Sequence, residues 1–191
     1  MKNRKQILDY WISPDDGRNG YEFYLGGWEK SLFLAELFLK YVPFDSSILE
    51  LGCSVGRNLR VLDGFGYDDL GGVEVNRDAW LNRITTKPIF LSTIETYMGL
   101  PPSHDVIFTM ATLEHIHPDS EWIFAKMQES AKMIITIEDE RQMSERHFPR
   151  NYKRVFKDMN HIHSEGCGNV RGLNKNFIAR VFINDKTKND G

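Results

Sequence analysis

Cysteine is nearly absent from this 191-residue chain, which contains only Cys53 and Cys167. The two residues form neither a C-x-x-C pair nor a zinc-ligand spacing, so the sequence predicts free thiols in a reducing compartment. Residues 1–16 contain no apolar run long enough for a signal peptide or a membrane span. We therefore expect a cytoplasmic protein without a membrane segment.

An excess of charge of one sign is also lacking. The chain carries 24 Lys and Arg residues against 27 Asp and Glu residues, which gives a net charge of −3 and argues against a surface that wraps nucleic acid. No repeat, low-complexity block or linker divides the chain. We expect residues 1–27 to form an N-terminal segment that can act as a lid and residues 28–184 to form one domain. Residues 185–191 are expected to be a disordered polar tail.

Short apolar strands alternate with helical stretches through most of the chain. Such βαβ units predict a parallel sheet covered by helices on both faces, and right-handed crossovers make it doubly wound. The predicted strands are 47–51, 72–75, 88–91, 105–110, 133–137 and 177–184, with a weaker candidate at 161–164. The predicted helices are 3–11, 28–41, 58–65, one opening at Asn76, and 119–131.

A glycine-bearing turn joins the first of these strands to its helix. Residues 48–58 read ILELGCSVGRN. Glycine lets the backbone approach a ligand closely, and the following helix N-terminus offers unpaired N–H groups. Because ligands of such sheets lie beyond the carboxyl ends of the strands, we expect a nucleotide or nucleoside here. The dinucleotide pattern G-x-G-x-x-G and the P-loop pattern are both absent.

The turn resembles motif I, [DE]-x-G-x-G-x-G, of the class I S-adenosylmethionine-dependent methyltransferases. Glu50 supplies the acid, Gly52 and Gly56 the first and last glycines, and Ser54 replaces the middle glycine. The resemblance covers about residues 45–140 and extends loosely to 184. It implies a seven-stranded Rossmann-like methyltransferase fold, S-adenosylmethionine as the methyl donor, and S-adenosylhomocysteine as the product.

The resemblance also implies which residues bind the cofactor. Glu74 follows Gly52 by 22 residues and matches the acid that holds a ribose diol in Rossmann-like sheets. Residues 92–95 match the turn that contacts adenine, with Thr93 in place of the usual acid and the backbone of Ile94 as the contact. Met110 matches a position beside the methionine moiety. The full expected set is Glu50, Gly52, Cys53, Ser54, Gly56, Glu74, Val75, Thr93, Ile94 and Met110.

Two histidines, His115 and His117, follow the strand at 105–110 and are the candidate catalytic residues. Either could act as a general base toward the methyl acceptor, since histidine titrates near neutrality. The alternative for His115 is ordinary packing in a loop. Glu114-His115 resembles part of an E-x-x-E-H metal motif of some methyltransferases, but its first Glu falls at Ala111. No metal site is therefore predicted.

The acceptor can be predicted only as a class. Residues 109–112 read TMAT, whereas enzymes that methylate the amines of bases carry [DNS]-P-P-[YFW] there. Neither cysteine follows a proline, as the nucleophile of cytosine-carbon methyltransferases does. We expect methyl transfer to O or N of a small molecule by a monomer or homodimer. The alternatives are a modifier of protein or RNA, and a non-catalytic partner subunit that keeps the fold.

Overall fold

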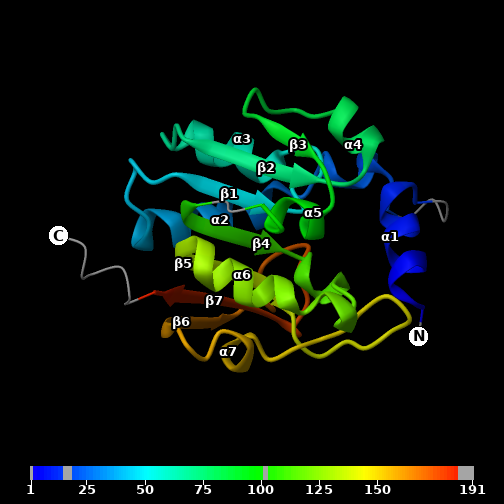
Figure 1. Ribbon diagram of the computed structural model, residues 1–191. Coiled ribbons are helices and arrows are strands. Elements are labelled where there is room, and N and C mark those ends of the chain that lie inside the picture. The colour runs from blue at the N-terminus through cyan, green and yellow to red at the C-terminus, as the bar shows by residue number, and fades with distance from the viewer. Residues whose placement is uncertain (1, 15–18, 101–102, 185–191) are drawn as a thin grey trace.

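A seven-stranded sheet organises the computed structural model, which describes residues 2–14, 19–100 and 103–184 (Figure 1). The strand order is β3-β2-β1-β4-β5-β7-β6. β1 to β5 run parallel, and β7 runs antiparallel to both of its neighbours. The predicted doubly wound, mostly parallel fold is confirmed. The strands are β1 (Ile48–Leu51), β2 (Leu70–Glu74), β3 (Ile89–Leu91), β4 (His104–Met110), β5 (Ala131–Asp139), β6 (Asn160–Gly166) and β7 (Phe177–Ile183).

Helices cover both faces of the sheet. Side chains at successive strand positions point to opposite faces, so Phe108 packs into one core with α2 and α3. The preceding residue, Ile107, packs into a second core with α5, α6 and α7. The helices are α1 (Arg4–Ile12), α2 (Trp28–Tyr41), α3 (Arg57–Gly64), α4 (Arg77–Leu81), α5 (Ile94–Met98), α6 (Trp122–Ser130) and α7 (Tyr152–Val155). No helix among the described residues is long and apolar enough to span a membrane.

Several elements differ from the sequence prediction. α5 and α7 were not predicted, and β2, β5 and β6 begin before the predicted strands. The helix expected from residue 119 starts only at Trp122, because Pro118 opens a separate 3₁₀ turn (Pro118–Ser120) capped by the side chain of His117. β5 continues two residues beyond its apolar run, since Glu138 and Asp139 still pair with β7 and are buried. The predicted tail at 185–191 lies outside the described residues.

The strand order places a crevice between β1 and β4. The chain winds from β1 through β2 to β3 in one direction and then crosses back to β4. Parallel sheets bind ligands at such a switch point, beyond the carboxyl ends of the strands. α1 lies across this end of the sheet, toward which the arrows of β1, β2 and β4 point in Figure 1. Residues of α1, in the N-terminal segment, therefore lie above the crevice.

Candidate active site

A cavity of about 430 Å³ lies at this switch point, between the carboxyl ends of the strands and α1. Its volume is in the range of small-molecule sites. Of the residues expected at the site, Gly56 alone is absent from the lining. That residue instead begins α3 as its N-cap. The expected residues that do line the cavity are Glu50, Gly52, Cys53, Ser54, Glu74, Val75, Thr93, Ile94, Met110, His115 and His117.

The motif I turn depends on left-handed backbone conformations. Gly52 has a φ of 75°, and a Cβ built there would lie 2.5 Å from Cγ2 of Thr112. Ser54 replaces the family's middle glycine and has a φ of 49°. This conformation costs a non-glycine residue about 1–2 kcal/mol. The hydrogen bond from the Ser54 N–H to Glu74 helps to hold the conformation, so the turn keeps its shape without the third glycine.

Glu74 joins the end of β2 to this turn. Its Oε2 accepts a hydrogen bond from Ser54 N at 2.6 Å, and its Oε1 accepts from Val75 N at 2.9 Å and Asn76 N at 2.7 Å. Burial raises the pKa of Glu74, while these three backbone donors act to lower it. A carboxylate has about four acceptor positions, so room remains for one ligand donor. Asn76 caps α4 as expected, accepting from Ala79 N.

Glu50 places a buried carboxylate at the end of β1. Its Oε1 accepts from Nδ2 of Asn58 at 2.6 Å, whereas its Oε2 has no partner in the described part of the chain. Burial raises the pKa of Glu50 to about 8, although the Asn58 hydrogen bond and the Arg57 charge oppose the shift. An unpartnered acceptor beside the cavity suits a cationic or N–H-bearing group of a ligand.

Lys30 brings an opposite charge to the same cavity from α2. The pKa of Lys30 is lowered by burial and by the nearby charge of Arg57. No carboxylate of residues 2–14, 19–100 and 103–184 forms an ion pair with Lys30, although it lines the cavity. Arg57 is itself occupied, donating to Ser31 Oγ at 2.8 Å and to the Gly26 carbonyl at 2.6 Å. Lys30 is therefore a cation at this end that can receive an anionic ligand group.

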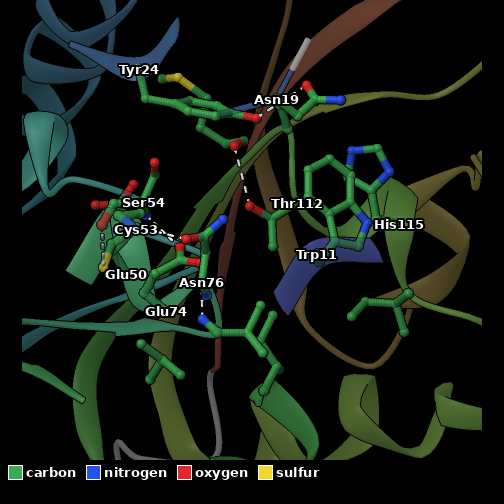
Figure 2. A pocket seen from close by; sticks show the side chains of 18 of the residues that line it. Trp11, Asn19, Tyr24, Glu50, Cys53, Ser54, Glu74, Asn76, Thr112 and His115 are labelled. Carbon is green, nitrogen blue, oxygen red and sulfur yellow. Dashed lines mark hydrogen bonds between the residues drawn. The ribbon is translucent and has the colours of Figure 1, made fainter. Parts of the chain in front are cut away.

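Aromatic rings form the side of the cavity under α1. Figure 2 shows the rings of Trp11 and His115 side by side. The centroids of these two rings are 4.4 Å apart. The ring of His147, which lies on the loop after β5, is 4.7 Å from the ring of His115. In the same view Glu50, Ser54 and Glu74 gather on the other side of the cavity. No local pattern singles out His147 in the sequence, because the loop that carries it has no periodicity.

The two histidines expected to be catalytic differ in what they can do. His115 Nδ1 lies 3.0 Å from the Arg146 carbonyl, which can only accept, so this nitrogen carries the proton. Burial lowers the pKa of His115 to about 3, which makes it a weak base at neutral pH. Nδ1 of His117 accepts from Asp119 N at 3.2 Å and caps a turn. A general base at either position remains a prediction.

Thr93 is engaged in local structure at the expected adenine turn. Its hydroxyl oxygen accepts from Thr96 N at 2.9 Å and thereby caps α5. The hydroxyl also lies 2.9 Å from the hydroxyl of Thr96. A helix cap of this kind orients the first N–H groups of α5 rather than leaving the side chain free. An adenine contact through the backbone of Ile94 remains a prediction.

Solved structures of methyltransferases share this fold. Magnesium protoporphyrin IX methyltransferase from Synechocystis PCC 6803, with bound S-adenosylmethionine, is 10% identical with a TM-score of 0.68 over 95% of this chain and 96% of that one. N-methyltransferase NodS from Bradyrhizobium japonicum WM9, with S-adenosylhomocysteine, is 15% identical with a TM-score of 0.68 over 96% and 100%.

A third structure carries both a cofactor product and an acceptor. The 1,6-didemethyltoxoflavin-N1-methyltransferase of Burkholderia thailandensis, with bound 1,6-didemethyltoxoflavin and S-adenosylhomocysteine, is 12% identical with a TM-score of 0.68 over 95% and 86%. No family model and no curated protein matches the sequence. This chain has the Rossmann-like methyltransferase fold, and the resemblance read from motif I is confirmed at the level of the fold.

Proposed function

We propose that this protein binds S-adenosylmethionine and transfers its methyl group to O or N of a small molecule. The observation that carries the proposal is the polar lining of the cavity. Glu74, Glu50 and Lys30 surround the motif I turn with a strand-end acid, a buried acceptor and a cation, and the last two have no partner within the part of the chain that the structure describes. S-adenosylmethionine offers a matching group to each of them.

Each matching group has a distinct partner in the proposal. The carboxylate of Glu74 accepts from a ribose hydroxyl through the acceptor position that the backbone leaves open. Oε2 of Glu50 accepts from the ammonium group of the methionine moiety, and Lys30 pairs with its carboxylate. Val75 and Ile94 lie where the adenine ring would be held, and Met110 lies at the end of β4.

The bound cofactor supplies a methyl carbon that its sulfonium already activates. The chain then needs to hold the acceptor atom in line with that carbon and to exclude water, and such positioning can supply roughly 7–11 kcal/mol in well-oriented cases. α1 and the loop with His147 form the part of the cavity that the cofactor assignment leaves free. A cavity of this size suits a small acceptor better than a folded protein or RNA.

Calorimetry with S-adenosylhomocysteine tests the cofactor assignment. We expect binding in the low-micromolar range and a raised melting temperature, because the ligand binds only the folded state. Lys30→Met should weaken binding about 10- to 100-fold, the value of a charge-assisted hydrogen bond, whereas Lys40→Met, on the exposed side of the same helix, should not. Binding of NAD or ATP in place of S-adenosylhomocysteine would refute the proposal.

A labelled methyl donor tests the acceptor class. The protein would be incubated with S-adenosylmethionine carrying a deuterated methyl group and, separately, with small-molecule extract, total RNA and total protein from cells. We expect mass spectrometry to find the label in a small molecule. Label in RNA or protein would replace the small-molecule reading, and binding without any transfer would favour a non-catalytic subunit.

A further inference from the structure

Two lone pairs face one another beside the aromatic side of the cavity. Oε1 of Glu114 lies 3.7 Å from Nε2 of His115. Nε2 carries no proton, because Nδ1 of the same ring donates to the Arg146 carbonyl. The other Glu114 oxygen, Oε2, accepts from Asp139 N at 2.6 Å, so the backbone fixes the direction in which Oε1 points. Two acceptors in this position need a positive charge or a proton between them.

A third unpartnered nitrogen lies next to this pair. Nδ1 of His147 is buried and has no hydrogen-bond partner among the residues that the structure describes. Ligand atoms of Glu114, His115 and His147 all lie within 4.8 Å of one another. All three residues line the cavity. The group therefore combines one carboxylate and two imidazoles around a single point.

We propose that Glu114, His115 and His147 bind a divalent transition-metal ion. Imidazole with carboxylate suits Zn²⁺, Fe²⁺, Co²⁺ or Ni²⁺ rather than Ca²⁺ or Mg²⁺, which prefer oxygen ligands. Two ligands that each lie about 2.1 Å from an ion are at most about 4.2 Å apart. The separation between Glu114 and His115 already meets this limit, and the whole group meets it after a side-chain adjustment of about 1 Å.

The surroundings of the three side chains fit such an ion. Metal-binding histidines usually donate their second ring N–H to a carbonyl or carboxylate, as His115 does to Arg146. Glu138 and Asp139, the last residues of β5, are also buried near Glu114. Burial and these neighbouring carboxyl groups raise the pKa of Glu114 to about 9, so a cation beside it would relieve the cost of ionising the side chain. The E-x-x-E-H pattern fails in the sequence because Ala111 is not a ligand, but the fold brings in His147 from another loop.

Cobalt titration of the untagged protein without any cofactor tests the site. We expect one equivalent of Co²⁺ to bind with visible d–d absorption and to quench the fluorescence of Trp11, whose ring lies 4.4 Å from His115. Zn²⁺ should displace it. His147→Gln and Glu114→Gln should each weaken Co²⁺ binding at least about tenfold, whereas His161→Gln on β6 should leave it unchanged.

Several outcomes would overturn the site. These are the absence of stoichiometric Co²⁺ binding, or binding that survives both His147→Gln and Glu114→Gln in variants whose circular dichroism is native. Either result would mean that Glu114, His115 and His147 do not form a site for the ion. The site rests on side-chain geometry alone, and the titration contains no S-adenosylhomocysteine. Its failure is therefore distinguishable from a failure of the proposed methyltransferase function.

Discussion

Replacing Glu74 with glutamine tests the cofactor site and the motif I turn in one experiment. Glu74→Gln keeps the shape of the side chain but has only one acceptor oxygen. If that oxygen takes the hydrogen bonds from Val75 N and Asn76 N, the amide NH₂ then faces Ser54 N, which lies 2.6 Å from Oε2 in the native protein. Two donors then oppose each other at a site that is 8% exposed.

The structure gives a magnitude for the effect of Glu74→Gln on stability and for its effect on S-adenosylhomocysteine binding. A hydrogen bond to a charged group contributes about 1.5–3 kcal/mol, so the free energy of unfolding should fall by about that amount. At roughly 2–4 °C per kcal/mol for a chain of this size, the melting temperature should fall by about 3–12 °C. Loss of the charged ribose contact should weaken S-adenosylhomocysteine binding about 10- to 100-fold. Glu36→Gln, an exposed change on α2, is the matched control and should alter neither quantity.

Calorimetry with S-adenosylhomocysteine and its 2′-deoxyribose analogue separates the ribose contact from the effect on stability. The analogue should bind the native protein weakly but lose little further affinity in Glu74→Gln, because both changes remove the same interaction. If the two losses simply add, Glu74 does not touch the ribose. A lowered melting temperature with unchanged affinity would leave Glu74 with a structural role only.

Three further changes test other parts of the site. Because the pKa of Glu50 is about 8 in the free protein and an ammonium neighbour would lower it, S-adenosylhomocysteine binding at pH 7 should release a proton and tighten as the pH rises toward 8. Calorimetry in buffers of different ionisation enthalpy measures the release, and Glu50→Gln should abolish it. Gly52→Ala should destabilise the protein by more than the roughly 1–2 kcal/mol of its left-handed backbone, because the new Cβ meets Thr112. When Thr112→Ala is added to Gly52→Ala, urea unfolding should show that the stability lost to the collision returns, whereas the stability lost to the backbone conformation does not. Complete recovery, or none, would contradict this. Arg150→Met should lower stability by at least about 2 kcal/mol, since its guanidinium donates to the carbonyls of residues 113, 116 and 148. An unchanged urea midpoint would contradict that expectation.

The sequence alone determined the sheet and the cofactor turn. Apolar strands of three to nine residues alternate with helices, and this pattern is a local property of the chain that specifies a parallel sheet. The glycines of motif I predict a turn for the same local reason, since their backbone angles are unfavourable for other residues. The acid at the end of the second strand, Glu74, could be placed by its distance from Gly52, because the βαβ unit fixes both ends.

Only the tertiary structure decided which polar atoms are left without partners. Lys30 comes from a helix before the first strand, and its lack of an ion pair among the described residues depends on where Arg57 and the acids of other elements lie. Glu74 looked like an acid at a strand end, yet the fold surrounds it with three backbone donors. His147 meets Glu114 and His115 only because β5 carries the next loop back over the cavity. His147 and Glu114 are 33 positions apart, so their proximity depends on packing, and no local spacing in the sequence encodes it.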